Sequence, residues 1–190
     1  MGGRSGIVRS WLPALRREQG SSLVSSLVEV VIIVGTAFIL ALLIQQFVVK
    51  PFYIPSESME NTLIKGDRVL VNRFIYRFTD PKPGDVVVFH PPSSPKEDYI
   101  KRVVAVAGDT VEVRDGKLYV NGVAKDEPYL KEQVIENTYA EETVPPGMFW
   151  AMGDNRNQSS DSRVFGPVEV NKILGKAFMI YWPVTKIGGL

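Results

Sequence analysis

Hydrophobic and polar positions follow different patterns on the two sides of Lys50. Before it, "LVEVVIIVGTAFILALLIQQFVV" (residues 27–49) is apolar over 23 residues and is charged only at Glu29. A helix of that length spans roughly 34 Å at 1.5 Å per residue, enough to cross the hydrocarbon core of a bilayer. The pattern therefore predicts one transmembrane helix, which we place at residues 23–49.

A cleavable signal peptide is the alternative interpretation of this segment. The uncharged centre, residues 30–44, follows an arginine-rich start, and both features are also typical of signal peptides. The continuation "QQFVVKPFYIPS", however, contains no Ala-x-Ala type cleavage site and stays apolar. We therefore favour a retained anchor over a segment that is removed.

After residue 50 the pattern changes to short alternating runs rich in Val, Ile, Phe and Tyr, which predict β-strands. These runs are "DRVLVNRFIYRF", "GDVVVFH", "YIKRVVAVAG", "DTVEVRDGKLYVNGV" and "GKAFMIYW". Asp115-Gly116 and Asn121-Gly122 are typical of two-residue hairpin turns that need positive φ. The prediction is one largely antiparallel β domain, without internal repeats or a second domain boundary.

Some apolar positions of this domain have two possible environments. In the last predicted strand both alternate sets of side chains are apolar, and "GMFWAM" places Phe149 beside Trp150. Such side chains belong either to the core or to a surface that touches lipid. We favour the core for both segments.

The distribution of charge orients the predicted helix. The first 22 residues carry four arginines against Glu18 alone, whereas Lys50 is the basic residue immediately beyond the apolar run. By the positive-inside rule, residues 1–22 form a cytoplasmic tail and residues 50–190 an extracytoplasmic β domain. From Lys50 onward there are 18 basic and 19 acidic residues. This part of the chain has no excess of positive charge that could hold a phosphate backbone, so we do not expect a nucleic acid partner.

Composition excludes several kinds of site. The chain has no cysteine, which rules out disulfides, thiol nucleophiles and zinc-thiolate centres. Its one histidine, His90, precedes a Pro-rich loop and is expected to be a surface residue. Asp154, Asn155 and Asp161 lack the spacing of an EF-hand calcium loop. We therefore expect neither a metal nor a cofactor.

Two serines one residue apart, Ser56 and Ser58, lie in "IPSESMENTL" just beyond the apolar run. They are interpreted either as part of a turn that leads into a short helix with a serine as N-cap, or as catalytic groups. A serine nucleophile needs a base, and without a credible histidine the substitute is an uncharged lysine.

Lys101 is the candidate for that base among the 11 lysines of the chain. Strand alternation in "DYIKRVVAVAG" places it on one face with Tyr99 and Val103. Burial on an apolar face would lower its pKa from about 10.4 towards the range of about 7 to 8 that suits a general base. The alternative is an edge lysine whose amine reaches water.

Taken together and in order, four features resemble the type I signal peptidases of bacteria. They are the N-terminal anchor, "PSESM" with "TL", "DYIKRVVAVAGD" and "GDNRNQSSDSR". The resemblance implies a membrane-bound serine endopeptidase with the antiparallel β fold that signal peptidases share with self-cleaving repressors. Its substrates would be exported preproteins at the lipid bilayer, cut after small residues in Ala-x-Ala type sites.

The resemblance also implies roles for individual residues. Ser58 would be the nucleophile, Lys101 the general base, and Ser56 with the Ser58 N–H the oxyanion hole. Ser159 would orient the lysine, and Gly153 would allow close approach beside it. The residues of the implied charged framework are Arg102, Asp154, Arg156, Asp161 and Arg163. Those implied in substrate binding, along segments 52–56 and 98–101, are Phe52, Ile54, Pro55, Met59, Leu63, Asp98 and Ile100.

Two positions depart from the family pattern. Glu57 stands where some members have glycine, and Asn61 replaces the proline often found before "TL". Neither position is implied in the chemical step, so both bear on specificity rather than on the reaction.

Three alternative functions stay open at this point. A self-cleaving repressor would share the serine and lysine, but it would be soluble. A membrane-tethered binding protein would carry the motifs in catalytically inactive form, and a secreted protein would lose the apolar run. A single-pass protein of the bacterial cell membrane is the location we expect, with an organelle such as a thylakoid as the alternative.

Overall fold

The computed structural model describes residues 22–190. Helix α1 (Ser22–Phe47) contains the apolar stretch Leu23–Ile44, which could cross a membrane by its length and composition. The helix ends two residues before the predicted limit, and Val49 already belongs to strand β1 (Val49–Tyr53). Pro51 accounts for this, because a proline disfavours helical geometry in the residue before it and cannot donate a helical hydrogen bond.

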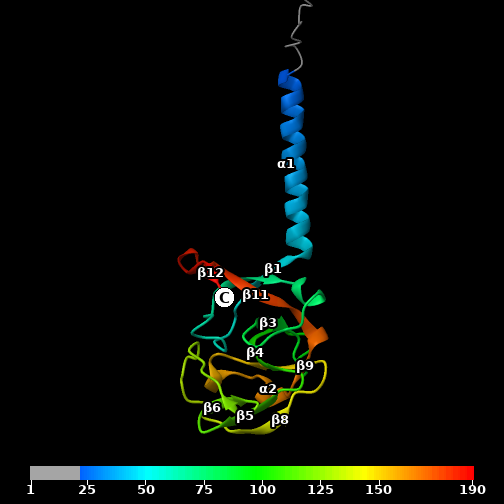
Figure 1. The fold of residues 1–190 in the computed structure, drawn as a ribbon. Helices are drawn as coiled ribbons and strands as arrows, with labels where there is room; N and C mark the ends of the chain where they lie inside the picture. Colours follow the sequence, from blue (N-terminus) through cyan, green and yellow to red (C-terminus); the bar gives the residue numbers. More distant parts are fainter. Residues whose placement is uncertain (1–21) are drawn as a thin grey trace, which may run out of the picture. The chain divides into compact units, whose positions relative to one another are not determined.

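The larger sheet is antiparallel, with the order β1-β2-β11-β3-β4-β9-β10 and with β12 beside β11. Figure 1 labels β1, β11, β3, β4 and β9 of this series. Strand β11, late in the chain, lies between β2 and β3 and is therefore central to the sheet. The further strands of this sheet are β2 (Arg68–Asn72), β3 (Val86–Phe89), β4 (Tyr99–Val106), β9 (Met148–Met152), β10 (Val168–Glu169), β11 (Ile173–Trp182) and β12 (Gly188–Gly189).

The smaller sheet has the order β7-β6-β5-β8. Its strands are β5 (Thr110–Arg114), β6 (Lys117–Val120), β7 (Val123–Ala124) and β8 (Tyr139–Thr143). Asp115 and Gly116 turn the chain with φ of 50° and 74°, and Asn121 and Gly122 with φ of 55° and 72°. Both predicted hairpin turns, and the mainly antiparallel β fold, are confirmed.

Between the strands lie one short α-helix, α2 (Ser162–Phe165), and four 3₁₀ turns. The prediction of a strand through "DRVLVNRFIYRF" is wrong beyond Asn72. The Asn72 side-chain oxygen accepts hydrogen bonds from the backbone N–H groups of Phe74 and Ile75, at 2.9 and 3.1 Å. This local bond competes with strand pairing and starts the 3₁₀ turn Ile75–Arg77. The other 3₁₀ turns are Arg156–Gln158, Val170–Lys172 and Val184–Lys186.

Burial decides between core and surface at the ambiguous apolar positions. Phe149 and Trp150 are both fully buried, as predicted. In β11, Ala177 and Ile180 are buried although they belong to opposite alternate sets. The pairing of β11 with β2 shifts register twice along this stretch, which breaks the alternation of faces. Only part of each set therefore faces the core.

Candidate active site

Ser58 lies in a turn that follows β1 and that we call the nucleophile turn, residues 56–63. Its hydrogen bonds run from the N–H groups of Thr62 and Leu63 to the oxygen of Met59, at 3.1 and 2.7 Å. No helix forms in this segment, so Ser58 is not a helix N-cap. The residue is only 7% exposed, which places its hydroxyl in a largely desolvated environment.

Strand β4 brings Lys101 to this hydroxyl. The Lys101 Nζ lies 2.6 Å from Ser58 Oγ, and it also donates to the backbone oxygen of Ile100 at 3.0 Å. Burial is the main cause that lowers the pKa of Lys101 from 10.5 to about 8, and the nearby carboxylates of Asp161 and Asp154 oppose it. At 4% exposure the amine does not reach water as an edge lysine would. The lowered pKa brings loss of the proton from this amine much closer to neutral pH than in a free lysine.

Two hydrogen-bond donors are available next to the nucleophile. The hydroxyl oxygens of Ser56 and Ser58 are 3.3 Å apart, as expected for side chains that converge on one side of the turn. Within residues 22–190, no acceptor takes a hydrogen bond from the backbone N–H of Ser58. A hydroxyl and an N–H in this arrangement can together stabilise a negatively charged oxygen.

Gly153 and Ser159 lie beside the nucleophile turn. A Cβ at Gly153 would collide with the Ser159 hydroxyl and with the backbone oxygen of Ser58, so only glycine fits. The Ser159 hydroxyl is buried, and no group of residues 22–190 forms a hydrogen bond with it. The structure therefore lacks the bond from Ser159 to Lys101 that the resemblance implied, and the amine is instead held by the Ile100 carbonyl.

Two ion pairs of the predicted framework hold the loop that contains Gly153 and Ser159. The guanidinium of Arg102 binds both carboxylate oxygens of Asp154, at 2.9 and 2.7 Å. That of Arg163 does the same with Asp161, at 2.9 and 2.8 Å. Asp161 also accepts a hydrogen bond from the Gly153 N–H at 3.0 Å, so the ion pair fixes the backbone beside the serine.

The third arginine of the framework has a partner that sequence reasoning missed. Arg156, 1% exposed, forms a bidentate pair with Glu127 at 2.7 and 2.8 Å and donates to the Gly153 oxygen at 2.9 Å. Glu127 belongs to none of the recognisable motifs, so no sequence signal could have found it.

Two further residues of the motifs, one on each side, join the nucleophile turn to the loop that contains Gly153 and Ser159, and neither link was predicted. Asn155 donates from its backbone N–H to the Ser58 oxygen and from its side chain to the Glu57 oxygen, both at 3.1 Å. The Thr62 hydroxyl donates to Asp154 at 2.5 Å. Both residues were visible within motifs, but a polar loop pattern does not indicate which backbone group a side chain reaches.

A cavity of about 480 Å³ opens at the pair of Ser58 and Lys101. Of the predicted substrate-binding residues, Pro55, Asp98 and Ile100 line it. The complete lining is Pro55, Ser56, Glu57, Ser58, Glu97, Asp98, Tyr99, Ile100, Lys101, Gln158 and Ser160.

The other four residues predicted to bind substrate lie elsewhere. Ile54, Met59 and Leu63 are at most 1% exposed in the core, and Phe52 packs against the same cluster. Their contact with substrate stays a prediction. His90, which the sequence predicts to be a surface residue, is partly exposed. Its Nδ1 lies 3.3 Å from Oδ1 of Asp98, a residue that lines the cavity.

A serine hydroxyl beside a desolvated lysine amine, on an antiparallel β domain, is the arrangement of a serine peptidase that uses lysine in place of histidine. The family model described as "Signal peptidase, peptidase S26" matches residues 27–182. The chain therefore belongs to the S26 signal peptidase family.

Two relatives found by sequence agree with this assignment. The chain is 39% identical to the signal peptidase I of Leptolyngbya laminosa over 173 residues, which cover 87% of this chain and 85% of the relative. It is 37% identical to the signal peptidase IB of Staphylococcus aureus over 177 residues, which cover 84% and 92%. The crystal structure of a signal peptidase I from Enterococcus faecalis aligns with a TM-score of 0.47 at 33% identity, over 52% of this chain and 97% of that one.

The protein is thus a membrane serine peptidase that removes signal peptides, and its family acts on the signal peptides of preproteins. The interpretation as an inactive tethered binding protein is not favoured.

Proposed function

We propose that Ser58 and Lys101 carry out the cleavage of exported preproteins after a small residue. The single observation that supports these roles best is the distance of 2.6 Å between the Ser58 Oγ and the Lys101 Nζ in a buried site. An ammonium group is costly to bury, so a lysine at this place is suited to be neutral part of the time and to accept a proton.

The reaction then proceeds in two halves. Neutral Lys101 takes the proton of Ser58 as its oxygen attacks the carbonyl carbon of the scissile bond. The Ser58 N–H and the Ser56 hydroxyl stabilise the negative oxygen that forms. As the peptide bond breaks, the Lys101 ammonium returns the proton to the leaving amine. Water, deprotonated by the same amine, then hydrolyses the ester on Ser58.

We propose that the substrate binds as an extended strand. Strand β1 is at the end of the larger sheet, and Tyr99–Lys101 of β4 pair only with β3 among the described strands. Each segment therefore presents a free edge to which a peptide can add by main-chain hydrogen bonds. Pro55 and Ile100 supply apolar surface in the cavity for small side chains.

We propose further that the protein is a single-pass protein of a bacterial cell membrane. Residues 1–22 would be cytoplasmic, residues 23–49 would contain the span, and residues 50–190 would form the extracytoplasmic catalytic domain. The arginines before the span support this orientation. The substrates in this topology are preproteins still held in the bilayer by their own apolar segment.

The first experiment tests the two catalytic roles. Detergent-solubilised protein is incubated with a preprotein that carries an Ala-x-Ala site, next to folded Ser58→Ala and Lys101→Ala variants. We expect cleavage at that site by the parent alone, because each variant lacks one half of the proton-transfer pair. Cleavage by either variant at the rate of the parent would exclude that residue from the reaction.

The dependence of the rate on pH gives an independent test. Because the base must be neutral and the pKa of Lys101 is about 8, activity is lost as the pH falls below that value. We expect kcat/KM to drop about tenfold per pH unit on the acid side and to level off above it. The measurement is the initial rate of cleavage from about pH 5 to 9, and a flat profile over this range is incompatible with Lys101 as base.

A further inference from the structure

Asn61 has a backbone conformation that is unusual for a residue other than glycine. Its φ is 88°, in the left-handed region. A proline, whose φ is fixed near −65°, cannot adopt this geometry, so the nucleophile turn of this protein excludes proline at position 61. Strained backbone of this kind persists where the surroundings hold it in place.

The surroundings that hold Asn61 lie far away in the sequence. Its side-chain amide donates to the backbone oxygens of Tyr129 and Leu130, at 3.0 and 3.3 Å. These carbonyls belong to residues 127–131, which we call the brace. A surface ion pair of 2.8 Å between Lys131 of the brace and Glu60 lies next to this link.

The brace is itself fixed to the loop that carries Gly153 and Ser159. The buried pair of Glu127 and Arg156 joins the two segments, and Arg156 in turn donates to the Gly153 oxygen. The Tyr129 hydroxyl donates to Glu127 at 2.6 Å, and the Lys131 N–H donates to the Asp154 oxygen at 3.3 Å. The amide of Asn61 therefore bonds to a segment with little freedom of its own.

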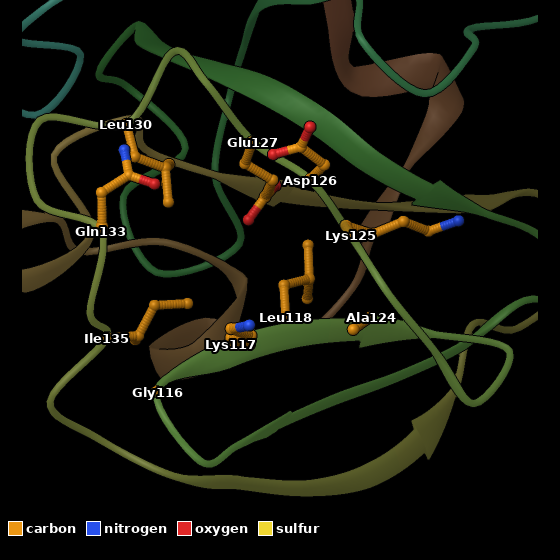
Figure 2. Close-up of a pocket in the computed structure, with 10 residues that line it drawn as sticks. All are labelled: Gly116, Lys117, Leu118, Ala124, Lys125, Asp126, Glu127, Leu130, Gln133 and Ile135. Atoms are coloured by element: carbon orange, nitrogen blue, oxygen red, sulfur yellow. The ribbon is translucent and has the colours of Figure 1, made fainter.

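The brace lines a pocket other than the catalytic cavity. Figure 2 shows Glu127 and Leu130 above a separate pocket of about 270 Å³, whose floor contains Leu118 and Ile135. This pocket shares no lining residue with the cavity at Ser58. Glu127 and Leu130 of the brace therefore line this separate pocket, whereas no brace residue lines the cavity at Ser58.

We propose that Asn61 is a positioning residue for the nucleophile. By tying the nucleophile turn to the brace, it keeps the Ser58 hydroxyl at the Lys101 amine and the Ser58 N–H directed at the cavity. This inference rests on the proposed roles of Ser58 and Lys101. Asn61 touches neither substrate nor the reacting atoms, and acts only through the backbone three residues away.

The test is the Asn61→Gly variant. Glycine tolerates positive φ, so the turn keeps its allowed conformation while both side-chain hydrogen bonds are lost. We expect kcat for an Ala-x-Ala preprotein to fall about tenfold, since two hydrogen bonds of ordinary strength are removed. KM and the midpoint of the pH profile are expected to stay unchanged, because neither the cavity lining nor Lys101 is altered.

Asn121→Gly is the matched control. Asn121 also has positive φ, and its side chain also makes two hydrogen bonds, with the N–H of Thr110 in β5 and with the carboxylate of Asp109 just before that strand. We expect this variant to lose comparable stability, measured by thermal unfolding, and to keep the kcat of the parent. A merely structural role of Asn61 would give the two variants the same kcat.

The outcomes separate this inference from the function on which it rests. If the parent cleaves and Ser58→Ala does not, a selective loss of kcat in Asn61→Gly supports the positioning role. An Asn61→Gly kcat within about twofold of the parent, or no lower than that of Asn121→Gly, overturns it. Failure of the parent itself to cleave would instead contradict the proposed function.

Discussion

The Lys101→Arg variant is expected to lose at least about a thousandfold in kcat while its β domain remains folded. The guanidinium keeps the positive charge at all accessible pH values, so it cannot take the proton of Ser58. The side chain at this position is 4% exposed and its amine lies 2.6 Å from the hydroxyl, so no water-borne base has easy access. The measurement is single-turnover cleavage of a preprotein, with circular dichroism to verify folding.

Lys176→Arg provides the control for this exchange. Lys176 is a partly exposed lysine on β11 that pairs with Asp85 at 2.5 Å, and arginine can keep that ion pair. We expect the variant to cleave at nearly the rate of the parent. Near-normal turnover by folded Lys101→Arg would refute the assignment of Lys101 as base.

The Gly153→Ala variant is expected to lose at least about a hundredfold in activity through sterics alone. The added methyl group would overlap the Ser159 hydroxyl and the Ser58 backbone oxygen, and the backbone cannot rotate away as a flexible side chain could. Either the nucleophile turn or the loop from Gly153 must move, which displaces Ser58 from Lys101. Overpacking of this kind also lowers the free energy of unfolding by about 1 to 3 kcal/mol.

Gly189→Ala controls for the loss of a glycine as such. A Cβ at Gly189 would have its nearest neighbour at 3.9 Å, in ordinary contact with the Phe178 oxygen. Thermal unfolding and cleavage are measured for both variants, and we expect Gly189→Ala to match the parent. A Gly153→Ala variant with the activity of the parent would show that the close approach at Gly153 is not needed for catalysis.

The sequence also predicted which residues belong to the site better than it predicted what they contact. Ser58, Lys101 and the arginines come from recognisable motifs, and the structure brings them together. The bond expected from Ser159 to Lys101 is absent within the described residues, and Ile54, Met59 and Leu63 lie in the core rather than along the cavity. A motif specifies the type and order of its residues. Which hydrogen bond a side chain forms, and whether it faces the core or the cavity, depends on the packing around the motif.

By itself, the sequence determined the features whose causes are local. The length of the apolar run specifies a helix that could span a membrane, and Asp115-Gly116 and Asn121-Gly122 specify hairpin turns, because positive φ and hydrophobic length need no distant partner. The tertiary structure alone decided the 2.6 Å approach of Ser58 to Lys101 and the link from Asn61 to the brace. These contacts join residues 43 and 68 positions apart, and only the packing of strands and loops into one domain sets such distances.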